Sequence, residues 1–338
     1  MSEYSSFILQ GQDMDLWDNA IEHSENATVF HQLAWLKAAE NHSLMKLLPL
    51  VIYKGDKLVC LCPLFYRKKH RFKIILSPPN SSGIPFLGPV FNIPASSRYN
   101  YERTFNEIQD EIISFSENQI GYDYFGIIHS PEVMDIRAYK NKGFSVNPAY
   151  TYRFNLREGL DWLLSNFHNT TRNALKKADK YDEIRISHDP NNAYPILDMI
   201  EHRYAEQGLD FKIKKNYFNE LKNSSISSNI EVITAFYQDQ LIAGDIAITY
   251  KKEGYAWLGT VNRENKITGI GELVLWKKMN DLSKRGIDSY DIVGANTPHI
   301  CKHKSKYGAD LIQYFEVYKT SFKGNFALKL LNKSGMRS

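Results

Sequence analysis

A short loop between a predicted β-meander and a predicted helix carries the clearest chemical pattern in this chain. Its residues are Lys266-Ile267-Thr268-Gly269-Ile270-Gly271, and an apolar, helix-like stretch follows at 272–286. The first turn of a helix has backbone N–H groups without partners and the positive end of the helix dipole. Glycines there let a ligand come close to the backbone. The pattern suits a phosphate or pyrophosphate; the alternative is a flexible turn that simply begins a helix.

The hydrophobic pattern around this loop predicts the elements that must position it. Apolar and polar residues alternate, or apolar residues run on, in five segments of strand length. These segments are 231–238, 241–250, 255–261, 289–294 and 311–318. We therefore expect a strand, a hairpin, a further strand, the glycine-bearing loop, a helix and two more strands.

The first half of the chain repeats this order in outline. A hairpin is predicted over 47–54 and 57–68, then a helix at 101–117 and a strand at 123–130. Prolines stand in the long loop of this half, where the second half has its glycines, so no phosphate loop is expected there. We predict a duplication with one functional loop.

Composition places the protein among ordinary globular chains. Its 338 residues suggest two domains, and 43% hydrophobic and 24% charged residues are typical of them. The longest apolar run, Leu47–Tyr53, is too short to cross a membrane, and no signal peptide is visible at the N-terminus. Cys60, Cys62 and Cys301 do not make a disulfide framework. We expect a cytoplasmic protein, with Cys60 and Cys62 packed on one strand face.

Basic residues offer a second, weaker pattern. Arg172, Lys176 and Lys180 are four apart, so they share one face of a predicted helix. An anionic partner would compensate their repulsion, although a solvated basic face near a helix C-terminus is the simpler alternative. The net charge of +4 is compatible with an anionic ligand and does not require nucleic acid. His299 and His303 flank Cys301, but Pro298 and the neighbouring lysines indicate a loop, so no metal site is expected.

Four stretches resemble the tandem GNAT (GCN5-related N-acetyltransferase) proteins that include the Fem-type peptidoglycan-bridge aminoacyltransferases and the FemAB-like or BioF2-like domains. They are Phe30-His31-Gln32 with Trp35, the turn at 143–144 with the strand and helix up to Ala178, Leu241–Asp245, and Tyr290–Asn296 with His303–Ala309. The glycine loop is similar to that family's Gln/Arg-x-x-Gly-x-Gly/Ala, with Lys266 in the first place. His303 replaces the usual Phe. The helical arm with which some Fem enzymes contact transfer RNA is absent after Asp182-Glu183.

The resemblance implies an α/β (α+β) fold of two tandem GNAT-like domains, each a mixed, mostly antiparallel twisted sheet flanked by helices. Residues 1–148 would form the domain without a phosphate loop and 149–338 the donor-binding domain. The implied activity is transfer of an acyl group from acetyl-CoA or another acyl-CoA to an amine on a small molecule or a cell-envelope precursor. The alternatives are a Fem-like transferase that uses aminoacyl-tRNA and a catalytically silent binding module. No metal and no membrane span are implied, and the oligomeric state is not indicated.

The same resemblance assigns residues to roles. Donor binding falls to Leu258, Gly259, Thr260, Lys266, Thr268, Gly269, Ile270 and Gly271. Backbone N–H groups at 258–260 would stabilise the tetrahedral oxyanion. Lys304 and Tyr307 match the family's Phe-Lys-x-x-Phe-Gly pattern, and Lys304 would contact an anionic group or the reacting carbonyl. The chemistry itself needs a general base and a general acid, for which the candidates are Asp245, Asp291, Tyr307 and Lys304. Arg172, Lys176 and Trp35 would bind the acceptor. The simpler alternatives are a surface lysine for Lys304, a core aromatic for Tyr307 and a bulge cap for Asp245.

Overall fold

The computed structural model describes residues 3–94, 97–322 and 324. Its contacts divide the chain into two compact units, Met1–Ala149 with Gln313–Ser338 and Tyr150–Ile312. Within the described residues, no helix combines the length and the apolar composition needed to span a bilayer.

The second unit is built on a six-stranded sheet. From one edge to the other its strands are β8 (Ile184–Ser187), β9 (Ile230–Tyr237), β10 (Gln240–Tyr250), β11 (Glu253–Val261), β12 (Ser289–Asp291) and β7 (Ser145–Asn155). Neighbours are antiparallel except β11 and β12, which run parallel. The helix between these two strands, α9 (Ile270–Lys284), makes their crossover connection.

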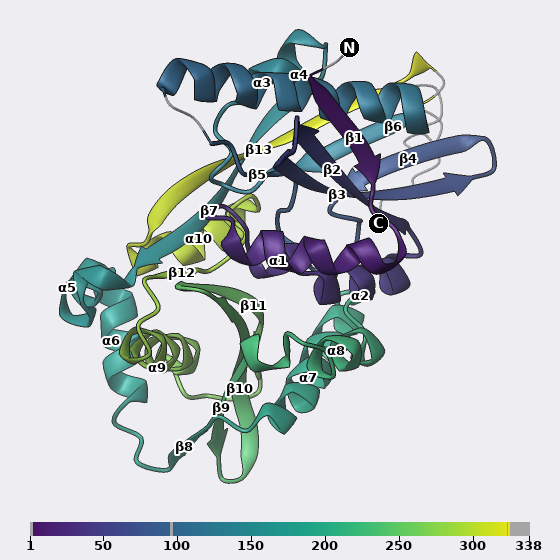
Figure 1. Ribbon diagram of the computed structural model, residues 1–338. Helices are drawn as coiled ribbons and strands as arrows, with labels where there is room; N and C mark the ends of the chain where they lie inside the picture. Colours follow the sequence, from purple (N-terminus) through teal and green to yellow (C-terminus); the bar gives the residue numbers. More distant parts are fainter. Residues whose placement is uncertain (1–2, 95–96, 323, 325–338) are drawn as a thin grey trace. The chain divides into compact units, whose positions relative to one another are not determined.

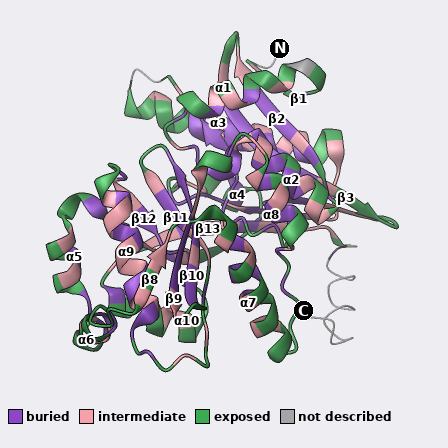
Figure 2. Ribbon diagram, turned by 90° about the horizontal axis from the view of Figure 1, so that it is seen from below, coloured by how far each residue is buried: buried purple, intermediate pink, exposed green. Residues whose placement is uncertain are grey.

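Helices cover both faces of this sheet (Figure 1). The helix α6 (Asn169–Ala178) packs beside α9, and α9 lies on β9, β10 and β11. On the other face α7 (Ala193–Glu206) lies on β10 and β11. The remaining helices are α5 (Leu160–Asn166), α8 (Lys215–Lys222), α10 (Pro298–Lys304) and the short turns Leu156–Glu158, Pro190–Asn192, Ser227–Asn229 and Ser305–Tyr307. In Figure 2, β10 is largely buried, whereas α6 and α7 carry exposed residues on their outer turns.

The first unit has the same order of strand directions. Its path is β1 (Tyr4–Ile8), β2 (Lys46–Lys54), β3 (Lys57–Lys69), β4 (Phe72–Ser77), β6 (Tyr124–Ile128) and β13 (Asp310–Thr320), with β5 (Val90–Phe91) paired to β3. Only β4 and β6 are parallel, as β11 and β12 are in the second unit. Its helices are α1 (Asp15–His23), α2 (Leu33–Ser43), α3 (Arg98–Phe115), α4 (Arg137–Asn141) and the turns Gly11–Met14, Val29–His31 and Ser116–Ile120.

The core of the first unit forms where α3 packs on this sheet. Ile108 and Ile112 of α3 are fully buried against residues of β2 and β3. Cys60 and Cys62 lie in the same cluster, both as free cysteines, which confirms that they are packing residues. Burial raises the pKa of both thiols, so they are poor nucleophiles.

The last strand of the chain differs from the division expected from the sequence. The sequence places one boundary after residue 148 and assigns everything beyond it to the second domain. In the structure, β13 pairs with β6 over Glu316–Thr320 and Tyr124–Ile128, so Gln313–Ser338 is grouped with the first unit. Hydrophobic alternation identifies a strand but not its partner, because pairing with a distant segment leaves no local pattern.

The two units differ most beyond the parallel strand pair. In the first unit, the Leu87 N–H donates to the Ile128 carbonyl and the Ser130 N–H donates to the Leu87 carbonyl. A bridge between Leu87 and His129 therefore continues the sheet beyond β6. Buried Phe86 and Leu87 fill the place where the parallel strands would otherwise part. The proline-rich loop thus closes the gap.

His129 should make the stability of the first unit depend on pH. Its ring is fully buried, neither ring nitrogen has a hydrogen-bond partner among the described residues, and burial lowers its pKa from 6.5 to about 3. Below pH 6.5, His129 binds a proton in the unfolded state but not in the folded state, so the free energy of unfolding decreases as the pH falls. Between pH 6.5 and pH 5 this histidine alone should cost about 2 kcal/mol.

When the pH falls from 7 to 5, we therefore expect the free energy of unfolding to decrease by about 2 kcal/mol less in His129→Phe than in the unchanged protein. Urea denaturation at both pH values measures the difference. Phe preserves the ring contact with Tyr139 and removes no hydrogen bond of the ring. Equal pH slopes in the two proteins would contradict this account.

Candidate active site

The site begins where β11 and β12 part. They pair over only three residues, Glu253–Tyr255 with Ser289–Asp291. β11 nevertheless continues to Val261 because β10 holds its other edge. Its register on β10 shifts at Trp257, where Ile246 pairs with Leu258 but Ala247 pairs with Ala256. Such a bulge increases the local twist and turns the strand away from its neighbour.

A cavity of 460 Å³ opens at this free edge of β11. Its lining residues come from β10, β11, α7, the first turns of α9, the segment after β12, and α10 with the turn behind it. They include Arg203, Asp245, Trp257, Gly259, Thr260, Gly271, Ile292, Val293, His303, Lys304 and Tyr307. Gly259 and Thr260 line the cavity, so they lie where the sequence expects an oxyanion hole, whereas Leu258 is not part of the lining.

Asp245 is a partly buried acid in the wall of this cavity. It pairs across the strands with Gly259, and a methyl group added at Gly259 would lie 3.1 Å from its Oδ2. The glycine therefore leaves room beside the carboxyl group. The Tyr290 hydroxyl donates to Oδ1 at 3.3 Å. Burial raises the pKa of Asp245 to about 6, and the ammonium of Lys278 opposes that rise.

The ammonium group of Lys278 is the counter-charge of Asp245. The sequence did not lead us to expect this role for Lys278. It lies on the core-facing side of α9 and is only 1% exposed. Burial lowers the pKa of Lys278, and the negative charge of Asp245 is the largest effect that favours the charged form of the lysine. A lysine in the middle of the apolar stripe of a predicted helix was the available signal, because lysine is almost never fully buried without a partner.

Tyr307 and His303 form a pair at the cavity. The Tyr307 hydroxyl lies 3.1 Å from His303 Nε2, and the two rings meet edge to face at 5.3 Å. Tyr307 is 6% exposed and also contacts Phe167, whereas His303 is exposed. Burial raises the pKa of Tyr307, so its proton is retained. Tyr307 thus reaches the cavity from the core, and His303 links it to solvent.

Lys304 holds the backbone that follows β12. Its Nζ donates to the carbonyls of Ile292 at 2.5 Å, of Val293, and of Gly294 at 3.1 Å. Three bonds use all three ammonium protons. Val293 and Gly294 both have positive φ, +40° and +77°, so this turn needs such support. As it stands, Lys304 therefore positions a wall of the cavity, from a helix where the sequence indicated a loop.

Asp291 supports the same turn from the other side. It accepts hydrogen bonds from Thr151 Oγ1 at 2.5 Å and from the Val293 N–H at 2.8 Å, and Arg153 lies 3.4 Å away. Its carboxyl group is fully engaged and does not line the cavity, which favours a positioning role over that of a base.

The two glycines of the loop do different work. Gly269 caps the N-terminus of α9 at φ +92°, and a methyl group there would lie 2.0 Å from the Ala174 carbonyl oxygen of α6. It therefore serves helix packing. Gly271 lines the cavity, and a methyl group there would lie 3.2 Å from Val261. No side chain caps α9, so its first N–H groups stay available to an anion.

Other predicted residues lie away from this cavity. Ile270 is buried in the core beneath α9. Lys266 and Thr268 line a separate cavity. Arg172 donates to the Ser165 carbonyl and to Asn169, and Lys176 is exposed on the same helix.

Trp35 does not reach a surface on which an acceptor could bind. It is 0% exposed in the first unit and packs edge to face on Phe30 at 4.8 Å. As a substrate-binding residue it is therefore a poor candidate, because its ring belongs to the core.

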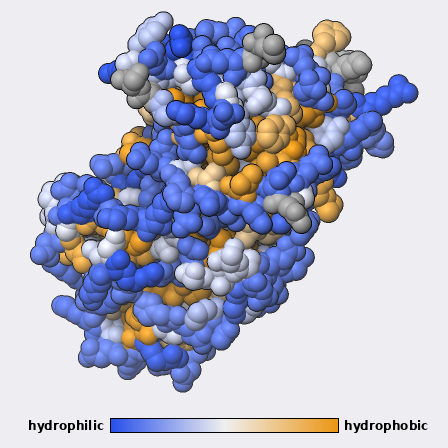
Figure 3. Space-filling view, in the orientation of Figure 1, coloured by the Kyte–Doolittle hydropathy of each residue, from blue (hydrophilic) through white to orange (hydrophobic). Residues whose placement is uncertain are grey.

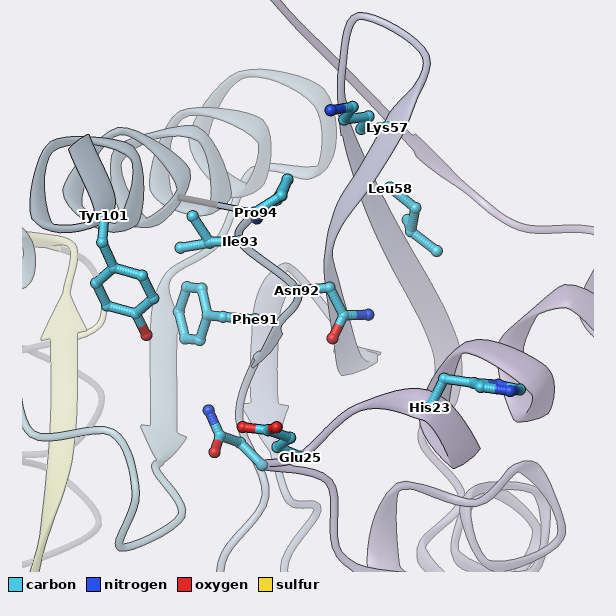
Figure 4. A pocket seen from close by; sticks show the side chains of 10 residues that line it. His23, Glu25, Lys57, Leu58, Phe91, Asn92, Ile93, Pro94 and Tyr101 are labelled. Carbon is cyan, nitrogen blue, oxygen red and sulfur yellow. The ribbon is translucent and has the colours of Figure 1, made fainter. Parts of the chain in front are cut away.

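The first unit has a cavity of 640 Å³ that differs in character from the cavity at β11 (Figure 4). It lies between the end of α1, the start of β3 and the segment Phe91–Pro94, next to Tyr101. In Figure 4 the charged groups of Glu25 and Lys57 lie far apart. No set of polar groups converges there, unlike the cavity at β11.

Comparison with known proteins agrees with this geometry. Residues 165–304 match the acetyltransferase (GNAT) domain family, and they span the strand pair, the glycine loop and Lys304. The resemblance to that family, read from the sequence, is confirmed over these residues.

Solved structures share the fold of this chain over nearly its whole length. FemX superposes with a TM-score of 0.71 at 11% identity, covering 96% of this chain and 99% of FemX. L-PGS from Bacillus licheniformis has a TM-score of 0.56 at 11% identity, covering 95% and 96%. A tandem GNAT protein from the clavulanic acid biosynthesis pathway has 0.53 at 10% identity, covering 94% and 98%. These similarities confirm the mixed α/β, FemAB-like fold. Among curated proteins, none matches the sequence significantly.

The different roles of Gly269 and Gly271 can be distinguished by experiment. Gly269→Ala places a methyl group against the Ala174 carbonyl at a positive φ, so we expect a loss of more than about 2 kcal/mol in unfolding free energy. Gly271→Ala meets only the end of the Val261 side chain and should stay within about 1 kcal/mol of the parent. Thermal and urea denaturation measure both. Equal losses would show that the contact at Gly269 is not the constraint described.

Proposed function

We propose that this protein is an N-acyltransferase that moves an acyl group from acetyl-CoA or another acyl-CoA to an amine. The observation that carries the proposal is the open cleft beside β11, in which a partly buried acid, Asp245, and a buried phenol, Tyr307, line one cavity. A GNAT domain implies acyl transfer in general. The donor, the acceptor and the roles below are part of the proposal.

In this mechanism the donor thioester lies along the free edge of β11. The uncapped N-terminus of α9 and the loop with Lys266 and Thr268 attract the donor's phosphates. The carbonyl of the thioester accepts hydrogen bonds from backbone N–H groups near Gly259 and Thr260, which stabilise the oxyanion. Positioning of the two reactants supplies much of the rate.

The bond changes balance with two protein groups. The unprotonated amine attacks the thioester carbon, and Asp245 takes the one proton that the amine nitrogen loses as the amide forms. The C–S bond then breaks, and Tyr307 gives its proton to the departing thiolate. His303, next to the Tyr307 hydroxyl, returns a proton from solvent. Lys304 and Asp291 act as positioning residues because they hold the turn that forms one wall.

The direct test is release of free thiol from acetyl-CoA in the presence of a panel of small amines and amino sugars. Amine-dependent release, with the acylated amine identified by mass spectrometry, supports the proposal. Binding of acetyl-CoA without release for any acceptor would leave the silent binding module as the better reading. The open cavity argues against that module.

Asp245 should impose a pH dependence on the reaction. With its pKa raised to about 6, the base is protonated and inactive below that value. We expect kcat/KM to rise with pH through about 6, and Asp245→Asn to lower it about 100-fold or more and remove that rise. Asp239→Asn, on an exposed turn, is the matched control. A variant at 245 with normal activity would exclude the base.

His303 should act through Tyr307. Tyr307→Phe should lower kcat about 100-fold, with the KM for acetyl-CoA changed less than about threefold. His303→Phe should lower kcat about tenfold, and the double variant should be no slower than Tyr307→Phe alone. Steady-state kinetics with melting temperatures as a control measure the coupling. Independent, multiplying effects would mean that the pair does not work as a unit.

The second candidate is a Fem-like transferase that uses aminoacyl-tRNA to modify a cell-envelope precursor. FemX, among the similar structures, and the exposed basic residues of α6 favour it. Binding of charged tRNA that weakens steeply with salt would support it, since each phosphate contact releases counterions. We propose that the protein works in the cytoplasm, because its cysteines are free and a reducing compartment keeps thiols in that state. Either reaction is compatible with that location.

A further inference from the structure

A second cavity, of 430 Å³, lies beside the glycine loop. Its lining residues are Lys177, Lys180 and Tyr181, from α6 and the turn that follows it, with Lys266 and Thr268 from the loop before α9. Three lysines and two hydroxyl groups thus meet from two separate segments. The lysine face expected from the sequence at Arg172, Lys176 and Lys180 contributes only its last member.

The charge of this cavity is not balanced by neighbouring acids. Among the described residues, none of the three lysines has an ion pair. The acid on the same turn, Asp179, is already bonded to Lys277 at 2.9 Å. Like charges gathered in one concavity repel, so the arrangement is stabilised by an anion. Lys177, Lys180 and Lys266 are all exposed to solvent. Most of the face drawn in Figure 3 is hydrophilic, with hydrophobic patches between.

One loop connects this lysine cavity with the cavity of 460 Å³ at β11, which we call the acyl cavity. Thr268 directly precedes Gly269, which touches the Ala174 carbonyl of α6 and fixes that helix against the loop. Two residues later, Gly271 lines the acyl cavity. The loop before α9 therefore contributes Lys266 and Thr268 to the lysine cavity, and the first turn of α9 contributes Gly271 to the acyl cavity.

We propose that Lys177, Lys180 and Lys266, with Tyr181 and Thr268, form a subsite for a phosphate monoester at the nucleotide end of the donor. A monoester carries about two negative charges at neutral pH, and a backbone diester only one. Three ammonium groups balance the former better. Hydroxyl groups add donors that fit its three free oxygens. This subsite rests on the proposed acyl-CoA reaction and adds α6 to the donor site.

The test compares CoA with 3′-dephospho-CoA, which lacks that monoester, by isothermal titration. The unchanged protein should bind CoA about tenfold or more tightly than 3′-dephospho-CoA. Lys177→Gln and Lys180→Gln should each narrow that preference about threefold or more, and should leave the affinity for 3′-dephospho-CoA nearly unchanged. Lys284→Gln, an exposed lysine on the last turn of α9, removes the same charge and should change nothing.

The outcomes separate the subsite from the reaction. Equal binding of the two nucleotides, or equal weakening of both in the variants, overturns the subsite and leaves the acyl-CoA reaction standing. If neither binds but adenosine 3′,5′-bisphosphate does, in a lysine-dependent way, the subsite stands and the acyl-CoA reaction falls. Binding of none of the three overturns both. Lysine-dependent binding of tRNA without a preference for CoA overturns the monoester assignment in favour of backbone diesters.

Discussion

The short pairing of β11 with β12 is the constraint on which the rest of the site depends. Three paired residues are enough to fix the directions of the two strands, and no more than that. β10 keeps β11 extended where β12 no longer does, and the bulge at Trp257 turns it aside. Two later features depend on the resulting edge: the cavity and the position of Asp245 in its wall. The first unit has the same strand order but seals the corresponding edge with Leu87. One architecture thus gives a closed core in one unit and a cleft in the other.

The cleft is surrounded by charged groups that a plain core would not contain. Lys278 and Asp291 are buried, and Asp245 and Lys304 are partly buried. Burying such groups costs free energy unless they are paired or hydrogen-bonded. Asp291 and Lys304 recover that cost through backbone groups of one strained turn. Asp245 and Lys278 recover less, since the structure gives Asp245 one hydrogen bond and, within the described residues, Lys278 none. That imbalance is what is expected of a site that gives up stability for reactivity.

Local patterns predicted much of this arrangement, and the misses have physical causes. The strands, the loop and α9 follow from alternation and glycine placement, because both are properties of neighbouring residues. The different duties of Gly269 and Gly271 do not, since they depend on how closely α6 approaches. Trp35 was misjudged because an aromatic side chain looks the same in sequence whether it lines a pocket or fills a core. Lys304 was recognised by its place in a motif, but its three carbonyl partners come from a turn ten to twelve residues away.

The route of the chain has a consequence for how the protein is made. β7 carries the chain from the first unit into the second, and β13 brings residues from 313 onward back to pair with β6. A ribosome therefore delivers the other strands of the first sheet long before the strand that completes it. Until then β6 has an unpaired edge, open to wrong partners. The second unit receives β7 at the outset and its other strands follow. During synthesis the unit that comes first is thus finished last, and a cut before residue 313 would leave that sheet incomplete.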